Sequence, residues 1–298
     1  MTLVVGRVTS DIGFLVADTL LTFEYDPKGV DRLVNGESHA LKIQIINPDT
    51  AIAFAGNVVA SLKLINNLNA ELRVHPRTKL AERLFESYKQ LLSEKSQIPP
   101  DCDFLVLQLT PEGRKLAHVT HEEVRYCDRA YIGDSDEYKR MMELRLPYCS
   151  PKIQHVQQPD GTFRETPLIE SEGEIEFAEI SNALEELTRQ RRRESSVGAI
   201  CGCVTRVVDA RISGKLEYLQ SAEASIWPWE GKSGFTVLAS NSDKRGIGIY
   251  YRVGKLGFLF IVGDTEFCRK EYAETLNQFI AVAKGAYGLD LQGGTWAE

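Results

Sequence analysis

Thr2 would carry a nucleophile and a base in one residue if it became the first residue of the chain. The initiator methionine is usually removed when the next residue is small, so loss of Met1 would leave Thr2 at the N-terminus. Its hydroxyl could then attack a carbonyl carbon, and its α-amine, with an ordinary pKa of about 8, could accept the proton through a water. This chemistry cleaves an amide bond through an ester.

Two charged residues are spaced so that they could meet Thr2. Strands are expected over 3–8 and 14–17, and the hairpin between them returns Asp18 to the beginning of the first strand. Lys42 opens the next predicted strand, where its ammonium could lower the pKa of the Thr2 hydroxyl while Asp18 holds it charged and oriented. Each residue also has a simpler interpretation when it is considered alone. Asp18 could cap a turn, and Lys42 could be an exposed residue of a strand.

Gly56 ends a predicted strand and begins a predicted helix over 58–72. A backbone N–H at the N-terminus of a helix can point at a developing oxyanion. A tight turn from strand to helix would also require glycine. Both roles can hold at the same position.

The rest of the chain alternates strand hairpins with helices. Strands are predicted over 41–46, 50–54, 104–109, 115–119, 123–127, 129–132, 197–208, 215–225, 234–239, 246–252 and 257–262; helices over 58–72, 78–92, 136–145, 176–193 and 264–285; and an exposed polar insertion over 147–174. Because helices come between antiparallel hairpins, the order predicts an α+β fold. We expect a four-layer αββα sandwich of two antiparallel sheets with helices on both outer faces. The strand–helix alternation of a βαβ fold is absent.

Several of these segments resemble the proteasome β-subunit family and its bacterial ring-peptidase relatives, which are N-terminal nucleophile (Ntn) hydrolases. The resemblance covers about 1–225 and is carried by Thr2–Gly6, Val16–Asp18, the Lys42 strand, Ala53–Gly56 and Ala130–Gly133. It implies the Ntn-hydrolase fold and a threonine-type peptidase. Its triad would be Thr2, Asp18 and Lys42, with the Gly56 N–H as oxyanion donor.

The chain departs from the family pattern at the supporting residues. The family has a serine directly after the Ile-Gly of a later strand, whereas here Asp134 stands there and Ser135 follows it. The family segment that carries an acidic residue and a serine corresponds to Glu194–Gly198 in this chain. Its acidic residue is kept as Glu194, but its serine is displaced. The resemblance gives Ser135 and Glu194 the supporting catalytic roles beside the terminal amine.

The predicted domains are a proteasome-like Ntn-hydrolase domain over 1–227 and a strand and helix extension over 228–298 packed on it. The extension holds an aromatic hairpin and an amphipathic helix. It could be a packing element alone. It could also form an oligomer contact or a cover over the active cleft.

Composition limits the classes of partner. The net charge of −7 and the pI of about 5.5 argue against a nucleic-acid footprint, which needs clustered Lys and Arg. With no long apolar run and no signal peptide, no membrane contact is expected and the chain is predicted to be cytoplasmic. The six cysteines show no metal-ligand spacing, so reduced thiols are expected, and His118 and His121 lack a third ligand nearby. Neither a metal nor a cofactor is predicted.

The resemblance also implies partners. These are a peptide or unfolded-protein substrate, further copies of the chain in a homo-oligomeric ring, and an ATP-dependent unfoldase. Two alternatives stay open. One is a small-molecule amidase or acylase of the same fold, with the long 19–40 loop shaping a closed pocket. The other is a non-catalytic proteasome-like assembly subunit, with either a retained Met1 or a degenerate site.

Overall fold

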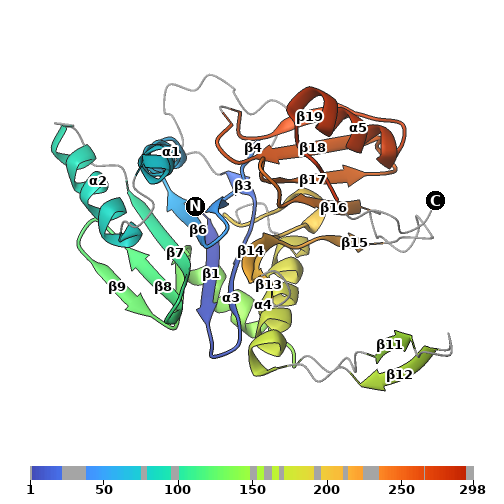
Figure 1. Ribbon diagram of the computed structural model, residues 1–298, viewed down its shortest axis with the longest axis horizontal. Coiled ribbons are helices and arrows are strands. Elements are labelled where there is room, and N and C mark those ends of the chain that lie inside the picture. Colours follow the sequence, from blue (N-terminus) through green and yellow to red (C-terminus); the bar gives the residue numbers. More distant parts are fainter. Residues whose placement is uncertain are drawn as a thin grey trace.

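The structure is a computed structural model of the 298-residue chain. It describes residues 2–21, 38–74, 79–94, 101–147, 153–157, 163–167, 171–190, 196–210, 214–223, 235–264 and 266–292. Figure 1 shows the arrangement of the elements.

The described residues form α-helices and antiparallel strands. The helices are α1 (Val58–Val74), α2 (Leu80–Glu94), α3 (Ser135–Glu143), α4 (Glu172–Arg189) and α5 (Leu276–Tyr287), with a 3₁₀ turn over Ile200–Gly202. The strands are β1 (Leu3–Val8), β2 (Gly13–Ala17), β3 (Leu20–Leu21), β4 (Ser38–His39), β5 (Ile43–Asn47), β6 (Thr50–Gly56), β7 (Cys102–Thr110), β8 (Gly113–Val119), β9 (Val124–Cys127), β10 (Arg129–Gly133), β11 (Ile153–Gln157), β12 (Phe163–Pro167), β13 (Thr205–Ala210), β14 (Lys215–Tyr218), β15 (Ser221–Glu223), β16 (Phe235–Ser240), β17 (Gly246–Tyr251), β18 (Leu256–Ile261) and β19 (Arg269–Tyr272). The predicted α+β class is therefore confirmed.

Three five-stranded sheets organise the described part of the chain. Their strand orders are β10-β1-β2-β13-β14, β5-β6-β7-β8-β9 and β15-β16-β17-β18-β19. The strand pairs β3–β4 and β11–β12 stand outside these sheets. Every pairing is antiparallel, as expected for strands joined by short hairpins.

Each of the first two sheets packs into a different core on each of its faces, because successive residues of a strand point to opposite faces. Along β6, Ala51 and Ala53 face a core shared by all three large sheets, whereas Ile52 and Phe54 pack with α1 and α2. Along β2, Leu15 and Ala17 face the shared core, and Phe14 and Val16 pack with α3 and α4. In Figure 1, α1 and α2 lie beside β6–β9, while α3 and α4 lie beside β1 and β13.

The third sheet lies largely within the predicted C-terminal extension. Its inner face contributes Val237, Ile249 and Phe260 to the shared core, and its other face is covered by α5. The Phe279 ring of α5 lies so close to Gly257 that a Cβ there would stand 2.1 Å from it. β15, which precedes the predicted boundary at residue 227, pairs with β16, which follows it. The division into two domains stays a prediction.

The predicted helix over 264–285 is wrong in its first half. Residues Arg269–Tyr272 pair with β18 as the edge strand β19, and α5 begins only at Leu276. Thr275 caps that helix by accepting the backbone N–H of Gln278. Tyr272, which fits the helical spacing, belongs to this strand, and spacing alone cannot reveal a partner strand.

The predicted strand over 197–208 is also too long. The strand begins at Thr205, and the preceding residues form a buried loop and the turn Ile200–Gly202. The Gly198 backbone of this loop forms hydrogen bonds with Asp18, Thr19 and Leu20, outside the β13–β2 pairing. The helix predicted over 176–193 starts earlier, at Glu172, because Ser171 and Glu174 form a capping box.

None of the helices in the described part of the chain is long and apolar enough to cross a membrane.

Candidate active site

Asp18 lies beside the beginning of β1, as the first hairpin predicts. β1 and β2 pair with Val4 opposite Ala17, which carries the next residue, Asp18, to Leu3. The Asp18 N–H donates to the Leu3 carbonyl at 3.3 Å, and the Leu3 N–H donates to Asp18 Oδ1 at 3.0 Å. The carboxylate is thus fixed one residue from Thr2, which is itself buried.

Lys42, the residue directly before β5 of the second sheet, reaches the same carboxylate. Its Nζ donates to Asp18 Oδ1 at 2.8 Å, and neither side chain is exposed. The backbone around Lys42 is held by β6, since the Phe54 N–H donates to the Lys42 carbonyl at 3.1 Å. Burial and this pairing exclude an exposed strand position for Lys42.

Two opposing influences act on the Lys42 ammonium. Burial disfavours its charge and lowers the pKa of Lys42 below the ordinary 10.5, while attraction and a hydrogen bond to Asp18 act in the other direction. An ammonium of lowered pKa, held by a fixed carboxylate, can stabilise a nearby oxyanion or take part in proton transfer.

The loop before β13 completes the environment of Asp18. The Gly198 N–H donates to Asp18 Oδ2 at 3.2 Å, and the Gly198 carbonyl accepts the N–H groups of Thr19 and Leu20. Both carboxylate oxygens of Asp18 therefore have donors. A carboxylate held in this way has a fixed direction.

Thr2 is held on its other side by the end of β10. Gly133 pairs with Leu3 and has a φ of +102°, and a Cβ at this glycine would lie 1.8 Å from the Thr2 carbonyl oxygen. The Asp134 N–H donates to the same oxygen at 2.8 Å. Glycine is required here because backbone meets backbone in a conformation that other residues rarely adopt.

Asp134 and Ser196 form a polar pair next to Thr2. Ser196 Oγ donates to Asp134 Oδ2 at 2.6 Å, and Asp134 Oδ1 caps α3 by accepting the N–H groups of Asp136 and Glu137. Partial burial opposes ionisation, but the hydrogen bonds from Ser196 and the two backbone N–H groups prevail, so the pKa of Asp134 falls below 3.8. The Asp134 carboxylate is therefore a negative charge close to the beginning of β1.

The two supporting residues taken from the resemblance have different outcomes. Ser135 is exposed, as the first residue of α3, and it is Asp134 that bonds to Thr2. Glu194 lies outside the described residues. The sequence does not predict Asp134, Ser196 or Gly198 as site residues. Asp134 does stand where the family has a serine, and Ser196 and Gly198 belong to the segment Glu194–Gly198.

Gly56 ends β6, as predicted, with a φ of +87°, and is exposed. A Cβ there would meet the Asp101 carbonyl oxygen at 2.0 Å, so the turn into α1 requires glycine. Asn57 then caps α1 by accepting the Ala60 N–H at 3.0 Å. Gly56 lies two residues beyond Phe54, the backbone partner of Lys42.

Other nucleophiles and metal centres find no support among the described residues. The cysteines with described side chains, Cys102, Cys127, Cys203 and Cys268, carry reduced thiols. Burial raises the pKa of the Cys102 thiol and raises that of Cys268 to about 12, which disfavours the reactive thiolate. No group of three or more His, Cys, Asp or Glu side chains in the described ranges could hold a metal ion.

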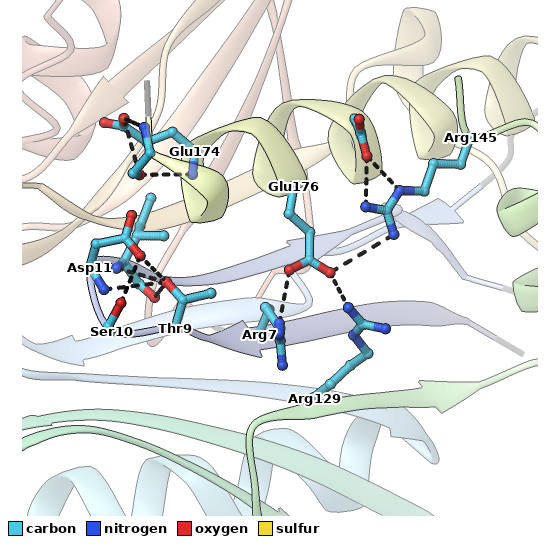
Figure 2. Close-up of polar contacts among 11 residues, drawn as sticks. Arg7, Thr9, Ser10, Asp11, Arg129, Arg145, Glu174 and Glu176 are labelled. Atoms are coloured by element: carbon cyan, nitrogen blue, oxygen red, sulfur yellow. Dashed lines mark hydrogen bonds and ion pairs between the residues drawn. The ribbon is translucent and has the colours of Figure 1, made fainter. Parts of the chain in front are cut away.

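A cavity of about 680 Å³ lies at the opposite end of β1 from Thr2. It is lined by the turn after β1 and by the beginning of α4, including Arg7, Asp11 and Glu176. Figure 2 shows Glu176 between Arg7 and Arg129, with Arg145 also directed at its carboxylate. This cluster connects α4 to the end of β1 and the beginning of β10, away from the residues around Asp18.

Comparison of the chain with protein-family models gave no match, and comparison with curated proteins found no similar sequence.

Proposed function

We propose that the chain is a threonine-type amide hydrolase in which Thr2 becomes the N-terminal nucleophile after removal of Met1. One observation carries this proposal. The Asp18 carboxylate accepts both the Leu3 N–H and the buried Lys42 ammonium, so a fixed ion pair lies one residue from Thr2. An isolated buried ion pair costs desolvation energy, which favours a functional reason for its presence here.

The proposed architecture is the four-layer αββα arrangement of the Ntn hydrolases. It is supported by the shared apolar core between the first two large sheets and by the helix pairs on their other faces. The third sheet, β15–β19, would be an addition to that arrangement.

The proposed reaction uses the groups around Thr2 in sequence. The Thr2 hydroxyl oxygen attacks the amide carbonyl carbon, and the free α-amine takes the hydroxyl proton through a water. The Lys42 ammonium favours the alkoxide character of the attacking oxygen, and the Gly56 N–H is a donor for the oxyanion. The amine of the substrate takes up this proton and leaves as the C–N bond breaks. Water then hydrolyses the ester, which releases the carboxylic acid and frees Thr2.

Asp134 has a supporting role in this proposal. Its N–H donates to the Thr2 carbonyl oxygen, so its ionised carboxylate would belong to the surroundings of the new terminal amine. A nearby anion favours the protonated amine and so raises the pH at which the amine can act as a base. Ser135 would contribute less than Asp134, because it is exposed at the beginning of α3.

The wider setting follows the family resemblance. We propose a peptide or unfolded-protein substrate, a homo-oligomeric ring that shelters the site, an ATP-dependent unfoldase partner and a cytoplasmic location. Native mass measurement tests the ring. A panel of peptides and small acyl amides distinguishes a peptidase from a small-molecule amidase.

Labelling with a threonine-directed electrophile tests the proposed nucleophile. Wild-type protein is expected to lose Met1, to be labelled on Thr2 and to hydrolyse an amide, whereas Thr2→Ala should be folded, unlabelled and inactive. Thr9→Ala, in the turn after β1, is the control for general loss of a threonine. Retention of Met1 together with an absence of hydrolysis would favour the degenerate assembly subunit.

A further inference from the structure

His39 is a buried titratable residue that the proposed reaction does not use. It lies in β4, opposite Leu20 of β3, and its Nδ1 is 3.0 Å from the Thr19 hydroxyl oxygen. Both side chains are buried, and Thr19 directly follows Asp18. The contact therefore joins the chain that leaves Asp18 to the chain that approaches Lys42.

The backbone around this contact leaves little freedom for Thr19. Its N–H donates to the Gly198 carbonyl at 3.1 Å, and its carbonyl accepts the Ala40 N–H at 2.8 Å. Gly198 also donates its own N–H to Asp18 Oδ2. A displacement of Thr19 would consequently move the Asp18 carboxylate relative to its donors.

The same contact lies close to Lys42 along the chain. His39 and Lys42 are three residues apart, and Ala40 between them is bonded to Thr19. The Thr19–His39 contact is a side-chain connection across this strand pair, between the two segments that bring Asp18 and Lys42 together. Because both segments must keep their register for the ammonium to meet the carboxylate, this contact can set the geometry of the pair.

We infer that His39, acting through the Thr19 hydroxyl, is a positioning residue for the Asp18–Lys42 ion pair. Its catalytic consequence rests on the proposed function. Loss of the contact would let Lys42 separate from Asp18. The Thr2 hydroxyl would then lose an ammonium held in a fixed position. Misplacement of a catalytic group by about 1 Å can lower a rate by roughly 100-fold.

The variants Thr19→Val and His39→Leu each remove one side of the hydrogen bond, and Thr19→Val does so with little change in shape. His39→Asn is the conservative variant, because its amide oxygen can accept from the Thr19 hydroxyl near the place of Nδ1. Thr188→Val is the matched control: it removes a similarly buried hydroxyl on α4, which donates to the Glu185 carbonyl at 2.7 Å.

Two measurements on the full-length protein test the inference. Amide hydrolysis gives kcat and KM, and titration of the Nζ signal in ¹⁵N-lysine-labelled protein follows Lys42, whose signal is identified by its loss in Lys42→Met. We expect Thr19→Val and His39→Leu to lower kcat by roughly 10-fold to 100-fold with KM nearly unchanged. The titration midpoint of Lys42 should fall, because the lysine loses the attraction of Asp18.

The double variant should be no worse than either single variant, since both remove the same contact. His39→Asn should restore kcat and the midpoint, and Thr188→Val should change neither. A wild-type kcat and Lys42 midpoint in Thr19→Val, or a loss of stability alone, would overturn the inference. If Thr2→Ala keeps the hydrolysis, the proposed function fails, and the Lys42 midpoint alone then decides whether His39 positions the pair.

Discussion

Lys42 Nζ and Asp18 Oδ1 lie 2.8 Å apart, and neither side chain is exposed to solvent. Asp18 follows a strand of the first sheet, and Lys42 precedes a strand of the second. The pair therefore connects the two sheets beside the beginning of β1. Removing two charges from water is costly, and the remaining donors from Leu3 and Gly198 help to offset this cost.

Breaking this ion pair should destabilise the fold. Asp18→Asn or Lys42→Met leaves one buried charge without its partner, and each should lower the free energy of unfolding by about 3–5 kcal/mol. Replacing both residues together should cost less than the sum of the two single changes. Chemical denaturation measures the effect, and Asp136→Asn, in the exposed pair with Lys139, should leave stability unchanged. Equal stability of Lys42→Met and wild type would show that the pair is not buried as described.

Activity should have a bell-shaped dependence on pH. The acid limb would follow the Thr2 α-amine, which must lose its proton to act as a base, with a reference pKa of about 8. The alkaline limb would follow Lys42, whose burial lowers its pKa below 10.5, so activity falls as the ammonium is lost. Asp18→Asn removes an attraction that raises the pKa of Lys42, so the alkaline limb of its residual activity should move to lower pH. A limb that does not move in this variant would contradict the role of Lys42.

Gly133→Ala should disturb Thr2 directly. The new Cβ would lie 1.8 Å from the Thr2 carbonyl oxygen, and a φ of +102° adds strain of about 1–3 kcal/mol. Stability should fall, and labelling of Thr2 should be lost even in the folded fraction. Gly113→Ala is the control, because it also has a positive φ, +130°, but nothing lies within 4 Å of its Cβ. The same loss of labelling in both variants would contradict a specific requirement for glycine at position 133.

Glu176 should matter for stability but not for chemistry. Figure 2 shows this buried carboxylate between Arg7 and Arg129, and its Oε2 lies 2.9 Å from Arg7 Nε. Glu176→Gln removes its charge and should lower the free energy of unfolding by about 2 kcal/mol. Folded variant should keep its Thr2 labelling. Thermal denaturation and labelling test this, with the exposed Glu86→Gln as control; a labelling defect would connect this end of β1 to the site.

The first hairpin explains why part of the site could be predicted. The β-rich runs 3–8 and 14–17 predict two strands, and the turn residues between them make the strands antiparallel, so the sequence spacing places Asp18 at Leu3. Gly56 was similarly predictable, because a glycine between a strand and a helix marks a turn of unusual φ. Both predictions depend on local geometry.

Contacts between distant segments were not predictable in the same way. Ser196 and Gly198 reach Asp134 and Asp18 through a loop that apolar residues made resemble a strand. The sequence predicts a helix over the edge strand β19, because the pairing of β19 with β18 depends on tertiary structure. His39 gave no sequence signal, since its contact with Thr19 depends on how two short strands meet.

The most direct measurement is the intact mass of the purified protein before and after exposure to a threonine-directed electrophile, for wild type and Thr2→Ala. We predict that wild type lacks Met1 and gains one label, localised to Thr2 by peptide mapping, and that Thr2→Ala gains none. A protein that retains Met1, or a Thr2→Ala variant that is labelled like wild type, would contradict the assignment of Thr2 as the nucleophile.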